Sequence, residues 1–360
     1  MMLKSAGLLV AMLLWAPVLQ AQDLMDWLQD SVQIQTTNHA SKSVDDDQAS
    51  ILTLEPRENE MFPRVSPDGK YLLTLSGKHR KLVISRRLLE NGDAVNIVSD
   101  SDELSFDSMA WHGNHSVSFL SFRADSLGLW QKPVTGGVVR RQLRLDGAMQ
   151  RALLLDDGSI IAVRMHTIRS MGMATAPHRL KPHRFDNWNQ HGKEAHLVRI
   201  SPDGVEQELS AGINPSISPD GKRLVFSMQA GKNWHLFMMA VDGSDLIQLT
   251  EGANIDVQPT WSPDSKWIAF TSNRDGANAG KPHHHTKTNW DIWLIGHDGR
   301  GLIRLTRDKA RDGAPSFGNN GRVYFHSDRV VRKQQRQRMQ VKNSPKGFHI
   351  WSVALPAKVS

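Results

Sequence analysis

The stretch from residue 214 to residue 250 has the sequence NPSISPDGKRLVFSMQAGKNWHLFMMAVDGSDLIQLT. It holds four short, mainly apolar runs, at residues 215–218, 223–228, 234–241 and 246–250, with polar segments between them. Pro219-Asp220-Gly221 and Asp242-Gly243-Ser244 are turn sequences, because proline presets φ and glycine accepts a positive φ. Short apolar runs bounded by such turns are typical of strands. The stretch therefore predicts four consecutive strands.

The same unit recurs along the chain. Its first turn can be followed through six positions: Gly69, Asn114, Gly158, Gly221, Ser265 and Gly321. The spacings between them are 45, 44, 63, 44 and 56 residues. A period near 44 with four strands per unit is typical of a β-propeller. We therefore expect an all-β protein, a six-bladed β-propeller of four-stranded blades.

The last unit has three strand-like runs, at 315–317, 323–327 and 349–353, and lacks a fourth. Near the start of the chain, Ile-Leu-Thr-Leu at 51–54 matches the fourth run of the 214–250 unit in character. Pairing of this segment with the last blade would close the ring and remove two open sheet edges. The propeller is expected to cover residues 51–356.

Several short motifs resemble those of a known family. They are Trp/Ile-Ser-Pro-Asp-Gly/Ser-Lys at 217–222 and 261–266, Phe-Thr-Ser-Asn-Arg-Asp-Gly at 270–276, and Trp-Asp-Ile-Trp at 290–293. Over residues 50 to 355 the chain resembles the TolB-type (PD40, WD40-like) propeller. The resemblance implies the fold and says little about function, since related propellers occur in TolB, in lid domains of prolyl oligopeptidases and in some polysaccharide lyases. TolB carries an α/β domain before its propeller, and residues 22–50 are too few for one, so the resemblance covers the propeller part only.

The N-terminus has the pattern of a secretory signal peptide. Lys4 precedes an apolar stretch at 8–15 that is too short to span a bilayer, Pro17 interrupts it, and Ala21 suits a cleavage site. An uncleaved anchor is the alternative. We expect a signal peptide at 1–21, a helix and flexible linker at 22–50, a periplasmic location and no transmembrane segment after signal removal. Cysteine is absent, which excludes disulfides and thiolate chemistry.

Three units carry long insertions between their second and third strands, at 166–196, 274–291 and 328–349. These segments hold five, three and seven Lys or Arg residues against two, two and one acids, whereas the whole chain carries a net charge of +7. Such loops open on one face of a propeller, so this face should attract an anionic ligand. Solvated, disordered loops are the alternative. The expected ligand- or partner-binding residues are Arg332, Lys333, Arg336, Arg338, His283, His284, His285, Arg179, Lys181 and Arg184.

A residue just before each first strand could line the mouth of an axial tunnel. The acidic candidates are Glu60, Asp107, Asp256 and Asp312, and turn hydrogen bonding is the alternative role for each. His283, His284 and His285 suggest a metal, but adjacent histidines do not usually converge on one ion. We therefore expect no cofactor, with a divalent metal left open.

The sequence favours binding over catalysis without settling the question. It contains no Gly-x-Ser-x-Gly nucleophile elbow, no Walker A loop and no dinucleotide fingerprint. The first hypothesis is an exported, non-catalytic scaffold protein of the cell envelope that binds an envelope protein or an anionic polysaccharide through its basic, His-rich loop face. The second is a lyase or hydrolase of acidic glycans, with or without metal assistance. Export argues against a nucleic-acid partner.

Overall fold

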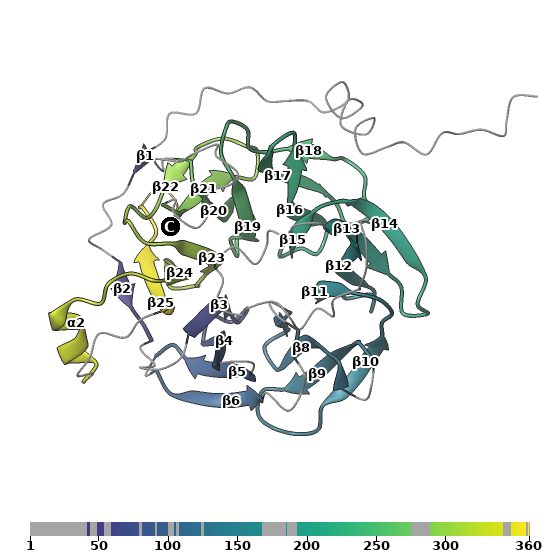
Figure 1. The fold of residues 1–360 in the computed structure, drawn as a ribbon, viewed down its shortest axis with the longest axis horizontal. Coiled ribbons are helices and arrows are strands. Elements are labelled where there is room, and N and C mark those ends of the chain that lie inside the picture. The colour runs from purple at the N-terminus through teal and green to yellow at the C-terminus, as the bar shows by residue number, and fades with distance from the viewer. Residues whose placement is uncertain are drawn as a thin grey trace, which may run out of the picture. The chain divides into compact units, whose positions relative to one another are not determined.

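The computed structural model describes residues 42–43, 49–53, 59–78, 81–90, 92–99, 104–105, 108–123, 126–167, 185, 193–274, 289–340, 347–357 and 359. The chain divides into two compact units, Met1–Gln33 and Ile34–Ser360. The predicted signal peptide at 1–21 lies outside the described residues, as does the predicted 22–50 segment up to residue 41. The second unit is a ring of six antiparallel blades, as predicted (Figure 1).

Each blade is a meander whose first strand lies innermost (Figure 1). Blade one is β3 (Asn59–Val65), β4 (Tyr71–Lys78), β5 (Lys81–Leu88) and β6 (Ala94–Val98). Blade two is β7 (Ala110–His112), β8 (Ser116–Ser121), β9 (Gly128–Pro133) and β10 (Arg140–Arg144). Blade three is β11 (Met149–Leu154), β12 (Ile160–Thr167), β13 (Lys193–Ile200) and β14 (Glu206–Ala211).

Blade four is β15 (Ile213–Ile217), β16 (Arg223–Ala230), β17 (Asn233–Ala240) and β18 (Ile247–Gln248). Blade five is β19 (Asp256–Trp261), β20 (Trp267–Ser272), β21 (Asp291–Gly296) and β22 (Ile303–Arg304). Blade six is β23 (Asp312–Phe317), β24 (Arg322–Ser327) and β25 (His349–Ala354), with β2 (Ser50–Ile51) as its fourth strand. A short strand, β1 (Lys42–Ser43), pairs in parallel with β22 and adds a fifth strand to blade five, within a segment expected to be a linker.

The N-terminal strand closes the ring as predicted. Leu52 and Thr53 donate their backbone N–H groups to the carbonyl of Ile350, at 2.8 and 3.3 Å, and the Thr53 hydroxyl accepts the Ile350 N–H at 3.0 Å. Thr250 and Thr306 accept the N–H groups of Leu236 and Ile292 in the same way in blades four and five, each at 2.9 Å. Thr53 therefore takes the place of the missing fourth-strand threonine.

The Ser-Pro-Asp motif builds the same turn in three blades. The hydroxyls of Ser66, Ser218 and Ser262 donate to the aspartate two residues later at 2.5–2.6 Å. Each serine oxygen also accepts a backbone N–H five residues on, at 2.9 Å. Because one serine satisfies both ends of the turn, its hydroxyl fixes the start of the second strand.

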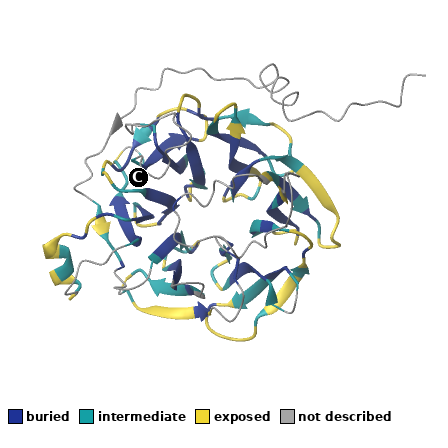
Figure 2. Cartoon of the chain, viewed as in Figure 1, coloured by how far each residue is buried: buried dark blue, intermediate teal, exposed yellow. Residues whose placement is uncertain are grey.

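The core lies between neighbouring blades. Trp293 and Phe270 of blade five pack with Leu236 and Met238 of blade four, and other clusters join blades two and three and blades five and six. At the closure, Leu72 of blade one meets Tyr324 and Ile350 of blade six. Burial falls from the inner strands to the outer edges β6, β10 and β14 (Figure 2). The blades are therefore held together mainly by apolar contact across their faces.

Candidate functional site

The inner strands of blades one, five and six each carry a buried carboxylate at or next to their first residue, on the side of the ring where the long insertions leave it; these are Glu60, Asp256 and Asp312. Asp256 is fully buried and accepts bonds from Arg274 (Nη2, 2.8 Å) and Ser272 (Oγ, 2.6 Å), with His235 of blade four at 3.8 Å. Burial by itself would raise the pKa of Asp256. The charges and hydrogen bonds of Arg274 and His235 outweigh it and lower the pKa to about 2.

The junction of blades five and six has a different composition. Asp312 pairs with Arg329 at 2.5 Å, and Asp291 pairs with Arg304 at 2.8 Å. An aspartate, Asp291, stands at the position that His235 occupies in blade four, so two acids face one another across this junction. Burial, followed by the charge of Asp312, raises the pKa of Asp291 to about 8, with Arg304 opposing the shift.

These placements change the roles expected for the tunnel-mouth acids. Glu60, Asp256 and Asp312 are 2%, 0% and 0% exposed, so solvent does not reach them as it would at an open mouth. Glu60 lies 3.5 Å from Arg87 and 3.6 Å from His349 of blade six. The three are members of buried ion pairs, while Asp107 lies outside the described residues. Arg274 and Arg329, counted above with the basic insertions, are likewise internal partners.

The insertion of blade three reaches blades five and six. It contributes Phe185, which is 2% exposed and stacks on Phe348 with ring centroids 5.9 Å apart. Trp290 and His326 lie at 5.4 and 5.7 Å from the same ring. A Cβ at Gly313 would lie 2.7 Å from the Phe185 ring, so glycine there makes room for it.

His326 joins this aromatic group to the inner strand of blade one. Its Nδ1 accepts the N–H of Phe62 at 3.3 Å, and the two rings meet edge to face at 5.2 Å. Burial, together with the charges of Arg64 and Arg311, lowers the pKa of His326 to about 3. The ring is therefore neutral at physiological pH and acts as a packing and hydrogen-bonding residue.

The basic residues predicted in blade six lie on a short helix, α2 (Lys333–Arg338). Arg332, Lys333 and Arg338 are exposed and Arg336 is half-buried. Val331 and Met339, on either side of the helix, pack into the core of blades five and six. The helix projects at the outer edge of the ring, beside β2 (Figure 1). His283, His284, His285, Arg179, Lys181 and Arg184 lie outside the described residues.

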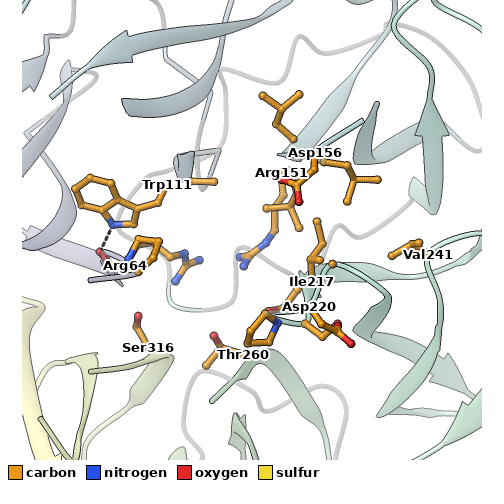
Figure 3. A pocket seen from close by; sticks show the side chains of 18 of the residues that line it. Arg64, Trp111, Arg151, Asp156, Ile217, Asp220, Val241, Thr260 and Ser316 are labelled. Atoms are coloured by element: carbon orange, nitrogen blue, oxygen red, sulfur yellow. Dashed lines mark hydrogen bonds between the residues drawn. The ribbon is translucent and has the colours of Figure 1, made fainter. Parts of the chain in front are cut away.

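A cavity occupies the centre of the ring on the other side, where the turns between first and second strands gather. It has a volume of about 580 Å³ and shares residues with a second cavity of about 390 Å³. Its polar lining includes Arg64 and Arg151, whose side chains extend into the same space from blades one and three (Figure 3). The other inner strands contribute hydroxyls: Ser216, Thr260 and Ser316.

The local backbone positions these two arginines. Residues 62 and 151 have positive φ (53° and 41°) at bulges in β3 and β11, and bulges re-aim side chains at the rims of barrels and near sites. Arg151 Nε donates to the Pro215 carbonyl at 2.8 Å, and Trp111 Nε1 donates to the Arg64 carbonyl at 2.8 Å. The sequence analysis did not identify either arginine. For Arg64 the available signal was its position two residues before the Ser-Pro-Asp turn, where blades four, five and six have Ser216, Thr260 and Ser316.

In the described ranges, no three His, Cys, Asp or Glu side chains form a group that could hold a metal ion. No helix within those ranges is long and apolar enough to cross a membrane.

Comparison with known proteins agrees with this fold. Residues 201–279 match the PD40 family, described as the TolB beta propeller domain. An uncharacterized protein of Agrobacterium fabrum is 29% identical over 141 residues, covering 38% of this chain and 44% of that protein. The Tol-Pal system protein TolB of Syntrophus aciditrophicus is 31% identical over 87 residues, which are 23% of this chain and 17% of that protein.

Among solved structures, TolB from Acinetobacter baumannii aligns with a TM-score of 0.53 at 16% identity, covering 72% of this chain and 57% of that one. At this identity the likeness shows the fold alone. The matched parts span less than half of the two curated relatives. The ring is therefore a TolB-like propeller, distant in sequence from TolB itself and matched over the propeller region.

Proposed function

We propose that this protein is an exported, non-catalytic binding protein of the cell envelope. Its partner is an envelope protein or an anionic polymer, held by the basic surface of α2 together with the basic, His-rich insertions. Arg332, Lys333, Arg336 and Arg338 are the residues proposed to bind it, with His283 to His285, Arg179, Lys181 and Arg184 beside them. A TolB-like propeller is a rigid platform whose projecting segments are suited to binding.

The observation that carries the proposal is the composition and anchoring of α2. Residues 330–340 contain four basic residues and no acid, and Arg332, Lys333 and Arg338 are exposed. Arg332 and Lys333 stand at the start of the helix, where positive charge opposes the helix dipole, so helix stability does not explain them. Val331 and Met339 hold the helix to the core, which reduces the entropy lost on binding.

Export rests on the N-terminal pattern of Lys4, the apolar run at 8–15 and Ala21. When the chain is expressed from its first methionine and recovered from the periplasm, its N-terminus is expected at Gln22. Recovery of the full-length chain in the membrane fraction would instead identify an uncleaved anchor.

Binding is tested with the protein purified after export, immobilised and exposed to polygalacturonate, to neutral dextran and to solubilised envelope. One variant carries serine at Arg332, Lys333, Arg336 and Arg338. A matched control carries serine at four exposed basic residues elsewhere, Arg140, Arg144, Arg223 and Lys232, and loses the same charge.

The α2 variant should bind about fourfold to several hundredfold more weakly, since the four exposed ion pairs contribute about 0.2–1 kcal/mol each. The control should bind like the wild type, and high salt should weaken binding because exposed charges are screened. Equal, salt-independent binding by both variants would overturn the proposal. Shortening of the polygalacturonate would show the glycan-cleaving activity instead.

A further inference from the structure

The junctions of blade four with five, five with six and six with one share one backbone arrangement. An aromatic residue near the start of each third strand lies beside the start of the next blade's inner strand. These contacts are the parallel bridges Trp234–Ile255 and Trp290–Arg311 and the bond from the Glu60 N–H to the Phe348 carbonyl, at 2.8 Å. The residue that follows each aromatic is therefore close to the buried acid of the next blade.

The junction of blades five and six differs from the other two in this residue. In the other junctions a histidine lies beside the acid, at 3.8 and 3.6 Å. Blade five has Asp291 at the position where blade four has His235. It also has Arg304 where blade four has Gln248, and both side chains bond the carbonyl of the threonine two residues on. The change from histidine to an acid is thus accompanied by a cation, which bonds Asp291 at 2.8 Å.

The two acids of this junction are buried at a single backbone bridge. Asp291 and Asp312 are 1% and 0% exposed, and the Asp312 N–H donates to the Trp290 carbonyl at 2.9 Å. Oδ1 of Asp291 is buried and has no hydrogen-bond partner in the part of the chain that the structure describes. Burial of this kind disfavours the charged form of a carboxyl group.

The charged groups that face the pair come from three segments. Arg304 of β22 bonds Asp291, and Arg329, which follows β24, bonds Asp312 and lies 3.7 Å from Asp308. The two arginines oppose the effect of burial without cancelling it, since the pKa of Asp291 is raised to about 8 and the pKa of Asp312 is also raised by burial. A protonated Asp291 therefore suits the closed junction.

The apolar core beside the acids also holds α2. Ile292 follows Asp291 and packs with Leu305 in the cluster that joins blades five and six. Leu305 is fully buried there. The same cluster includes Val331, which precedes α2 and fixes it to the ring. Separation of the two blades at the acid pair thus exposes Leu305 and loosens the attachment of α2.

We propose that the junction of blades five and six is a pH-responsive seam, which is closed while Asp291 is protonated and opens locally when Asp291 loses its proton. Opening admits water to the two carboxylates. The contribution of Asp291 to the closed state is fully present below about pH 4 and is lost as pH rises towards 8. The open fraction should therefore rise over this range and level off above it. The seam goes beyond the function proposed above, and only its effect on α2 bears on binding.

The chain contains no cysteine, so a single introduced thiol can report the opening. Leu305→Cys places this thiol in the seam. Leu249→Cys is the matched control, because it occupies the same position in blade four, where a histidine lies beside the acid. Each variant of the exported protein is labelled with iodoacetamide from pH 5.5 to 9. Each rate is divided by the rate of the same variant in urea at the same pH, which removes the titration of the thiol itself.

Between pH 6 and 8 the normalised rate of Leu305→Cys should rise by about tenfold to a hundredfold, since one proton changes the equilibrium by up to about tenfold per pH unit. The rate should level off above about pH 8. The rate of Leu249→Cys should change by less than about threefold, and so should that of Leu305→Cys when it is combined with Asp291→Asn.

Arg304→Gln separates titration from a general weakening of the seam. It introduces the residue found in blade four and removes the cation that lowers the pKa of Asp291. The pH at which the Leu305→Cys rate levels off should therefore move upwards. A seam that is weakened for another reason would be labelled faster at every pH, with no shift of this point.

If Leu305→Cys does not fold, hydrogen exchange of the cysteine-free protein gives the same comparison. Amides of residues 289–292, corrected for their intrinsic rates, should lose protection between pH 6 and 8 in the wild type and keep it in Asp291→Asn. The proposal is overturned if Leu305→Cys and Leu249→Cys show the same pH dependence, or if Asp291→Asn leaves the rise unchanged. Because no ligand is present, failure here does not affect the function proposed above, and the converse also holds.

Discussion

The two ends of the inner strands differ, although the same six strands build both. At the insertion side, the inner strands of blades one, five and six carry carboxylates near their start that are buried in ion pairs, beside the aromatic contacts of Phe185. At the turn side, the same strands end around an accessible cavity with Arg64 and Arg151 in its wall (Figure 3). In the described residues, the buried carboxylates at the insertion side have ion-pair partners inside the ring, whereas the turn side opens on a cavity. The comparison teaches that the partners supplied by neighbouring blades decide whether a charged residue near the axis stabilises the fold.

The largest effect is expected from Phe185→Ala. Removing a buried aromatic ring from among Trp290, His326 and Phe348 should lower the free energy of unfolding by about 3–5 kcal/mol. Urea denaturation measures it, with Val138→Ala, at an exposed site, as a control that stays within about 0.5 kcal/mol. A loss below about 1 kcal/mol would mean that the insertion does not stabilise blades five and six.

Arg274→Met should cost about 3 kcal/mol, because it leaves Asp256 buried without its guanidinium. The lowered pKa of Asp256 in the wild type gives a stabilisation that is present above about pH 4 and is lost as pH falls towards 2. The difference between the two proteins should therefore be largest near neutral pH and shrink in acid. Lys266→Met breaks the exposed pair with Asp264 and should cost less than 1 kcal/mol. Equal costs would contradict the distinction between buried and exposed pairs.

Asp291→Asn tests the junction where two acids face each other. The pKa of Asp291 is raised to about 8, so its contribution to stability is fully present below about pH 4 and is lost as pH rises towards 8. The asparagine variant does not ionise, and its stability relative to the wild type should rise over this range, by at most about 1.4 kcal/mol per pH unit. Unfolding at pH 5, 6.5 and 8 measures the trend, with Asp242→Asn in an exposed turn as the control. A flat or falling difference would show that Asp291 is ionised in the folded protein at neutral pH.

The smallest effect concerns the cavity wall. Trp111→Phe removes the bond to the Arg64 carbonyl and should cost about 1 kcal/mol of stability. Trp261→Phe removes the corresponding bond to the Ser216 carbonyl in blade five, at 3.2 Å, and should lower stability by a similar amount. Urea denaturation measures both losses. A loss well above about 2 kcal/mol in either variant would mean that the indole contributes more than this one hydrogen bond.

Much of the fold could be predicted from sequence because it is specified locally. The Ser-Pro-Asp turn is a set of bonds among residues at most five apart, and residues 51–54 match the fourth run of the 214–250 unit in character. The structure adds that Thr53 makes the same hydrogen bond as Thr250. Strand β1 was missed, since two residues in a polar segment carry no periodic pattern.

The candidate sites were less predictable because a sequence does not show whether a charged side chain is paired inside the fold or exposed on its surface. Arg274 and Arg329 belong to insertions rich in basic residues, yet they neutralise Asp256 and Asp312 inside the ring. Glu60 was expected near an open axis, and it is buried against Arg87 and His349, which lies 289 positions away. Arg64 and Arg151 lie in different repeats, and no motif in the sequence indicates that their side chains extend into one cavity.

The sequence by itself determined the repeat, the number of blades and the turn chemistry, because hydrogen bonds and apolar periodicity within about 44 residues specify them. It also indicated the closing strand, because residues 51–54 resemble the strand that the last unit lacks. Only the tertiary structure decided which charged side chains are paired inside the ring. That depends on contacts between blades, such as Phe185 with Phe348 and His235 with Asp256, which the repeat does not specify. Burial then determines whether a carboxylate or a guanidinium stabilises the fold or remains available for binding.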